Sequence, residues 1–158
     1  LAYIMEKAHE KGLVTVLNPS PMNEKISTLP LDTVNYFLLN EVEASQILGK
    51  ETTGDETWEV IAGQLLERFP YASIVLTMGS EGSVFKNHEE TVIQPIYKVQ
   101  AVDTTAAGDT FTGYFIGGIL SGLSAKEAMD QAAKASAIAV TRRGAAPSIP
   151  VLSEVQAY

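Results

Sequence analysis

Hydrophobic positions along the chain alternate between short continuous runs and longer stretches with helical spacing. Continuous apolar runs bounded by turn residues are typical of buried strands, whereas apolar positions three and four residues apart are typical of amphipathic helices. The predicted strands are 13–17, 34–39, 73–78 and 83–86, and the weaker alternation at 92–96 and 99–102 predicts antiparallel strands near a sheet edge. The predicted helices are 1–11, 40–48, a third that is capped by 53–55 and runs through Trp58 to Phe69, 108–121, 124–141 and a short last helix at 151–158.

Glycines and capping residues support these boundaries. Gly12 and Gly49 follow two of the helical stretches, as glycine commonly does at a helix end. Ser124 and Glu127 have the spacing of a capping box. Three glycines within 108–121 would weaken an exposed helix, so we expect another backbone to pack closely against it. They are Gly113, Gly117 and Gly118.

The alternation of strands and helices predicts an α/β fold. Parallel βαβ units place helices on both faces of a sheet, which gives a three-layer α/β/α arrangement with a mostly parallel sheet. Ligands in such folds bind at the carboxyl ends of the strands. The loops after Leu39, Met78 and Val102 would open at that edge if their strands are parallel.

Length and composition limit the class of protein. The chain of 158 residues is long enough for one domain with a hydrophobic core. Its net charge of −8 argues against nucleic acids and anionic membranes as partners. No apolar run approaches the roughly 20 residues of a membrane span. The absence of Cys excludes disulfides and thiolate metal sites and is consistent with a cytoplasmic protein.

The stretch 102–111 carries the strongest candidate chemistry. Asp103 and Asp109 flank small residues, and Asp109 lies where a helix is predicted to begin. The first N–H groups of a helix have no internal partner and its dipole is positive there, so a phosphate fits beside the small residues Ala106, Ala107 and Gly108. A carboxylate next to bound phosphate can take a proton from an attacking hydroxyl. The alternative is that Asp109 is an ordinary helix N-cap.

Two further motifs follow predicted strands. Asn40-x-x-Glu43 could bind phosphate and, through water, Mg²⁺, but the same spacing fits an N-cap with its capping-box partner. Thr77-x-Gly79-x-x-Gly82 could bring backbone and hydroxyl groups close to a ligand, although the spacing alone favours a hairpin turn. No Gly-Lys-Ser/Thr follows it, so a P-loop ATPase is not expected.

These three motifs in this order resemble the ribokinase-like (PfkB) family of carbohydrate kinases. The segment Asp-Thr-Thr-Ala-Ala-Gly-Asp at 103–109 is similar to the family's C-terminal signature. The resemblance implies that residues 1–158 are the nucleotide-binding and catalytic portion of a ribokinase-like domain, with its N-terminal half and lid absent. It further implies transfer of the ATP γ-phosphoryl group to a sugar hydroxyl, with Asp109 as base at the substrate and the N–H groups of 106–109 as anion hole.

The resemblance also implies cofactors and their residues. Nucleotide contacts are expected from Asn40, Thr77, Gly79, Ser80, Glu81, Gly82, Gly108 and Ala133, the last a doubtful base contact because many relatives carry a polar residue there. Glu43 would hold Mg²⁺ through water. A K⁺ ion would take oxygens from Asp103, Thr105, Ala139, Arg142, Gly144 and Ser148, and the alternative is a solvated Arg-Arg pair at a helix end. The full-length protein would be a homodimer.

The sugar stays open at this point. The signature and the loop 142–148 are most similar to ribose-phosphorylating members of the family, so ribose is favoured, whereas fructose, 2-keto-3-deoxygluconate and a nucleoside are the other acceptors. Two alternatives without catalysis are a nucleotide-sensing module on the same fold and a structural fragment that associates through an exposed half-core.

Overall fold

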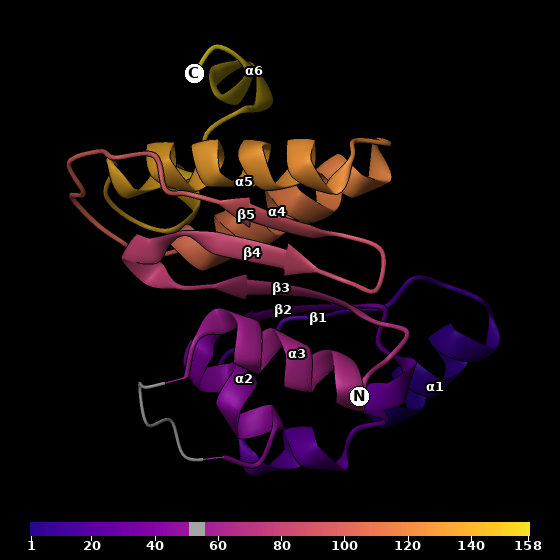
Figure 1. Cartoon of the computed structure of the whole chain (residues 1–158). Coiled ribbons are helices and arrows are strands. Elements are labelled where there is room, and N and C mark those ends of the chain that lie inside the picture. Colours follow the sequence, from indigo (N-terminus) through magenta and orange to yellow (C-terminus); the bar gives the residue numbers. More distant parts are fainter. Residues whose placement is uncertain (51–55) are drawn as a thin grey trace. The chain divides into compact units, whose positions relative to one another are not determined.

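The computed structural model describes residues 1–50 and 56–158 and divides into two compact units. The first unit comprises Leu1–Met78 and Val84–Thr91, and the second comprises Gly79–Ser83 and Val92–Tyr158. Figure 1 follows the chain through both. The cap predicted at 53–55 lies outside the described residues.

The first unit is built on a mostly parallel sheet. Its strands are β1 (Val16–Leu17), β2 (Tyr36–Asn40), β3 (Ser73–Thr77) and β4 (Ser83–Lys86), which begins at the unit boundary, and they are neighbours in that order. β1 pairs parallel with β2, and β2 pairs parallel with β3. Figure 1 shows β4 running opposite to β3. The prediction of an α/β fold with a mostly parallel sheet is confirmed.

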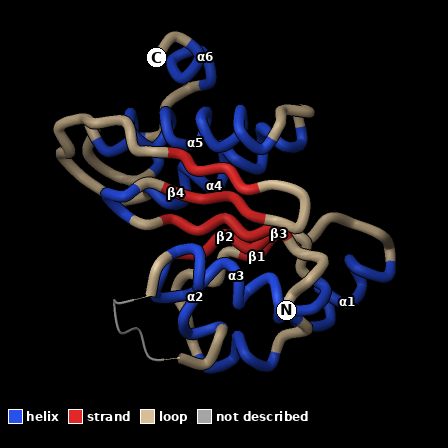
Figure 2. Tube along the Cα trace, in the orientation of Figure 1, coloured by secondary structure: helices blue, strands red, loops and turns tan. Residues whose placement is uncertain are grey.

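Three helices of the first unit accompany this sheet (Figure 2). They are α1 (Ala2–Glu10), α2 (Glu41–Ile47) and α3 (Trp58–Arg68), and two 3₁₀ turns, η1 (Glu24–Thr28) and η2 (Leu31–Thr33), connect β1 to β2. The core contains Phe37 of β2, Leu65 of α3 and Ile74 of β3, all fully buried. The rings of Phe37 and Phe69 lie 4.7 Å apart. As predicted, Phe69 belongs to the core, and Trp58 packs against it while partly exposed.

The first seventeen residues are less buried than their pattern predicts. Of the apolar face expected for α1, only Met5 is buried, whereas Leu1 and Ile4 are each about two-thirds exposed. The predicted buried strand at 13–17 is also wrong in extent, since pairing begins only at Val16. The backbone of Thr15 is instead held by a side chain, because its N–H donates to Asn35 Oδ1 at 2.8 Å.

The second unit contains a long helix pair. β5 (Thr91–Gln94) starts at the last residue of the first unit and continues into the second. The helices are α4 (Ala107–Leu120), α5 (Ala125–Val140) and the short α6 (Leu152–Gln156), with 3₁₀ turns η3 (Gly79–Glu81) and η4 (Ala146–Ser148). The capping box of Ser124 and Glu127 is present, as predicted. Within the described ranges, no helix has both the length and the apolarity needed to cross a bilayer.

The strand predicted at 99–102 does not form. The N–H groups of Val102 and Asp103 both donate to the carbonyl of Val140, at 2.7 and 3.1 Å, so the segment is fastened to the end of α5. Of the three strand ends expected at one sheet edge, those of β2 and β3 therefore remain. Their last residues, Asn40 and Thr77, are partners in the parallel register.

Only one of the three glycines of α4 fulfils the predicted packing role. A Cβ at Gly118 would lie 3.1 Å from Ala128 Cβ, so α4 and α5 approach closely there. At Gly113 and Gly117 the same atom would meet nothing within 4 Å. The sequence pattern does not distinguish these positions because all three lie on one predicted helix.

This difference predicts opposite effects of one substitution at neighbouring positions. In the full-length protein, Gly117→Ala should raise the free energy of unfolding by about 0.5–1 kcal/mol, because alanine is the better helix former. The free energy of unfolding of Gly118→Ala should be lower than that of Gly117→Ala by roughly 1–3 kcal/mol, because the added methyl group overpacks against Ala128. Urea unfolding of both variants measures the difference, and equal stabilities would contradict the packing described.

Candidate active site

The helix α4 begins from a strained turn. Its N-cap is Ala106, with φ 62° and ψ 11° in the left-handed region. Ala106 is the only residue other than glycine in the described part that has a positive φ. Such conformations cost energy and are found most often at ligand sites and other constrained positions. The Ala-Ala-Gly sequence at 106–108 is therefore matched to an unusual backbone geometry.

Two N–H groups at this turn have no protein partner. Ala107 N–H donates to Thr104 O at 3.2 Å and Thr110 N–H donates to Ala106 O at 2.8 Å. The N–H groups of Gly108 and Asp109 form no hydrogen bond with any residue that the structure describes. A Cβ at Gly108 would meet nothing within 4 Å, so the space above the turn is open. Free donors at the positive end of a helix are suited to an anion.

Asp109 lies in the first turn of α4 rather than before it. The structure assigns the N-cap to Ala106, which has no capping side chain, so the interpretation of Asp109 as an ordinary N-cap is wrong. Asp109 is exposed. Its carboxylate therefore accompanies the free N–H groups at the same helix end and is accessible to an incoming molecule.

The Asp103 carboxylate accepts two backbone hydrogen bonds next to the turn. Its Oδ1 accepts the N–H of Thr105 at 2.9 Å, and its Oδ2 accepts the N–H of Gly144 at 2.9 Å. The hydroxyl of Thr105 and then the backbone N–H groups of Gly144 and Thr105 lower the pKa of Asp103 from 3.8 to about 2. An ionised Asp103 thus joins the start of the turn to a loop 41 residues later.

The helix α5 supplies a contact that the sequence did not reveal. Ser136 Oγ donates to the carbonyl of Ala107 at 3.2 Å and so fixes the first residue of α4. Ala133, the expected base contact, is half-buried one turn earlier on the same side of α5. No motif in the sequence singled out Ser136, because a serine within an alanine-rich helix has no distinctive pattern.

Of the residues expected to bind K⁺, Thr105 and Gly144 contact the Asp103 carboxylate, and both do so through their backbone N–H groups. The Ala139 carbonyl accepts the N–H of Arg142 at 3.0 Å, and the fully buried Ser148 donates its hydroxyl to Ala145 O at 2.7 Å. Within residues 1–50 and 56–158, no cluster of three or more His, Cys, Asp or Glu could hold a metal ion. Carboxylate and carbonyl oxygens of this kind suit hard cations.

The glycine turn after β3 has a rigid geometry. Gly79 and Gly82 have φ of 53° and 105°, which few side chains tolerate. A Cβ at Gly82 would lie 2.3 Å from Gln94 O, so glycine is required there by space as well. The turn leads into β4, which runs opposite to β3, and the hairpin interpretation is confirmed. Ser80 and Glu81 are exposed, and their expected contact with nucleotide stays a prediction.

In the first unit, Asn40 and Glu43 form a capping box at the start of α2. Asn40 Oδ1 accepts the N–H of Glu43 and Glu43 Oε2 accepts the N–H of Asn40, both at 2.9 Å. The capping interpretation is therefore confirmed. Glu43 Oε1 forms no hydrogen bond in the described part, so it can still accept one from metal-bound water. Thr77 Oγ1 donates to Leu39 O at 3.3 Å across the ends of β3 and β2.

Comparison with known sequences identifies relatives over almost the whole chain. A family described as pfkB family carbohydrate kinase matches residues 1–152. The ribokinase of Schizosaccharomyces pombe is 38% identical over 159 residues, which cover 96% of this chain and 48% of that protein. The chain thus spans about half the length of this relative.

Comparison with solved structures identifies the same family of proteins. Ribokinase from Cryptococcus neoformans in complex with ADP has a TM-score of 0.84 and 29% identity, covering 99% of this chain and 55% of that one. Arabidopsis thaliana ribokinase complexed with ribose and ATP has a TM-score of 0.80 and 29% identity, covering 98% and 50%. The predicted ribokinase-like fold is confirmed by these similarities.

The low pKa of Asp103 predicts a specific acid response. A carboxyl group whose pKa is lowered on folding stabilises the protein above its unfolded pKa of 3.8, and this stabilisation is lost as the pH falls toward the folded value of about 2. Wild type should therefore exceed Asp103→Asn in urea midpoint by a constant margin above about pH 5, and the margin should shrink between about pH 4 and 2. A margin independent of pH would contradict the charged hydrogen bonds described.

Proposed function

Because the chain belongs to the pfkB family of carbohydrate kinases, we propose that its full-length protein transfers the γ-phosphoryl group of ATP to a ribose hydroxyl, giving ribose 5-phosphate. The observation that carries this proposal is the pair of unpartnered N–H groups at Gly108 and Asp109, beside an exposed carboxylate on a left-handed turn. The similarity to the S. pombe ribokinase supports ribose as the acceptor.

In the proposed reaction, Asp109 accepts the proton of the sugar hydroxyl as its oxygen attacks the γ-phosphorus. The P–O bond to ADP breaks as the new P–O bond forms, and negative charge spreads over the transferred group. The N–H groups of Gly108 and Asp109 and the helix dipole stabilise that charge. Ala106 and Ala107 leave the space that the phosphoryl group needs, and Asp103 and Ser136 hold the turn in place.

The nucleotide and its ions are assigned to the remaining motif residues. The named complexes of the neighbouring structures, with ADP and with ribose and ATP, support ATP as phosphoryl donor. We assign nucleotide contacts to Asn40, Thr77, Ala133 and the turn 79–82, and water-mediated Mg²⁺ binding to Glu43 through its unbonded Oε1. Bound Mg²⁺ would neutralise phosphate charge. K⁺ near Asp103 would add an electrostatic brace to the turn.

A base assigned to Asp109 predicts a selective loss of turnover. In the full-length protein, Asp109→Asn should lower kcat by about 10²- to 10⁴-fold, since the amide cannot accept the proton. Circular dichroism and the melting temperature should stay near wild type, because the exposed Asp109 side chain has no hydrogen-bonded partner in the described part. Asp32→Asn, at another exposed aspartate in η2, is the matched control and should keep full activity. If Asp109→Asn retained most of the wild-type kcat, Asp109 would not be the catalytic base.

Two experiments separate the rival functions. Initial rates with ribose, fructose, 2-keto-3-deoxygluconate and a nucleoside identify the acceptor, and we expect the highest kcat/KM with ribose. A nucleotide-sensing module would bind a non-hydrolysable ATP analogue in calorimetry yet phosphorylate none of these compounds. The exposed Asp109 beside free N–H groups favours the kinase, since a sensor has no use for a base.

A further inference from the structure

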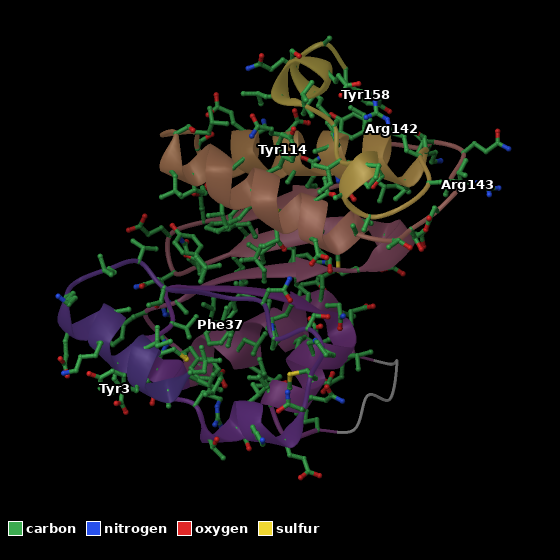
Figure 3. The ribbon with its side chains drawn as sticks, turned by 180° about the vertical axis from the view of Figure 1, so that it is seen from behind. Tyr3, Phe37, Tyr114, Arg142, Arg143 and Tyr158 are labelled. Carbon is green, nitrogen blue, oxygen red and sulfur yellow. The ribbon has the colours of Figure 1, made fainter. Side chains whose placement is uncertain are left out.

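The C-terminal segment is fastened to the loop that contacts Asp103. Arg142 Nη2 donates to Glu154 Oε1 at 2.6 Å, and Nη1 donates to Glu154 Oε2 at 3.4 Å. This bidentate pairing fixes the orientation of the Arg142 guanidinium group as well as its distance from the Glu154 carboxylate. Figure 3 shows Arg143 extending away from the ribbon. The adjacent arginines therefore have different surroundings.

Glu154 is itself held in place by its helix. Its Oε2 also accepts the N–H of Val151 at 2.9 Å, at the start of α6. The short helix is anchored by Val155, which is 2% exposed. Just before it, the carbonyl of Pro150 accepts the hydroxyl of Tyr114 from α4 at 2.7 Å. Glu154 thus extends from an anchored element, so the position that it gives Arg142 is defined.

Two hydrogen bonds of Asp103 connect the loop after Arg142 to the residue before the anion-binding turn, which is the turn at 106–109. Gly144, with φ 90°, directs its N–H to Asp103 Oδ2 at 2.9 Å. Asp103 Oδ1 accepts the N–H of Thr105, next to the left-handed Ala106. Glu154 is therefore connected to the residue before the turn by the Arg142 ion pair, by the backbone from Arg142 to Gly144, and by the two hydrogen bonds of Asp103.

We propose that Glu154 is a positioning residue: its pairing with Arg142 sets the loop 142–144, and through Asp103 the loop sets the anion-binding turn at 106–109. The proposal rests on the proposed kinase function for its effect on turnover, but not for its effect on the loop. It gives α6 a role in phosphoryl transfer without any contact with substrate. It also explains why Arg142 needs a partner, whereas Arg143 acts on Asp103 only through its charge.

The competing interpretation is an ordinary surface ion pair. The side chains of Arg142 and Glu154 are 36% and 42% exposed, and exposed pairs generally contribute little to stability. A global stability measurement alone would not separate the two interpretations. The readout must report on Gly144 and on the chemistry at the turn.

The test uses the full-length protein with Glu154→Gln, which removes the charge and keeps one oxygen acceptor. Hydrogen exchange by NMR should show the Gly144 amide exchanging faster, by up to about 5-fold, the range expected for an exposed pair. Turnover of ribose should fall by a similar factor with the KM for ribose unchanged, since Glu154 does not touch substrate. Arg142→Gln should reproduce both effects, and the double variant should add nothing to either single one.

Glu10→Gln is the matched control, because it breaks the exposed Lys7–Glu10 pair of α1 by the same substitution. It should change neither Gly144 exchange nor turnover. The proposal is overturned if Glu154→Gln leaves Gly144 exchange at the wild-type rate, or if exchange rises while turnover stays unchanged. A wild-type protein that phosphorylates no sugar would refute the proposed function and with it the catalytic part of this inference. The exchange measurement would still test whether Glu154 sets the loop.

Discussion

The proposed site depends on one constraint, which is that a helix cannot satisfy its own first N–H groups. In α4 the left-handed Ala106 leaves the donors of Gly108 and Asp109 without partners among residues 1–50 and 56–158, and Gly108 leaves the space above them open. A side-chain cap at this point would occupy the place of the proposed anion. In the proposed reaction the small residues of the signature leave room for the phosphoryl group, and the strain at Ala106 must be balanced by contacts elsewhere in the second unit.

Those contacts come from three directions within the second unit. Asp103 accepts the N–H groups of Thr105 and Gly144, Ser136 of α5 bonds to the carbonyl of Ala107, and Gly118 lets α4 lie close against α5. Because an ionised Asp103 is favoured by three hydrogen bonds, the brace holds at neutral pH. The turn is thereby preorganised, which is the condition under which backbone donors stabilise a transition state most effectively.

Most of the architecture could be predicted from periodicity and punctuation. Gly49 and the pair of Ser124 and Glu127 marked helix boundaries correctly, and the runs at β2 and β3 gave the parallel strands. The predictions of the strands at 13–17 and 99–102 were wrong. The pattern at 13–17 does not reveal that pairing starts at Val16, and the pattern at 99–102 does not reveal that Val140 O accepts the N–H groups of Val102 and Asp103. Likewise the motif indicated the turn that contains Asp109, but Ser136 and Glu154 contact residues distant in sequence and carry no local signal.

The most direct test of the central claim follows the two free amides themselves. The full-length protein, labelled with ¹⁵N, is titrated with a non-hydrolysable ATP analogue, Mg²⁺ and ribose, while the backbone amide resonances of Gly108 and Asp109 are recorded. The account predicts that both resonances move downfield on saturation, as their N–H groups gain phosphate oxygen acceptors. Saturable binding that shifts other amides and leaves these two unchanged would contradict it.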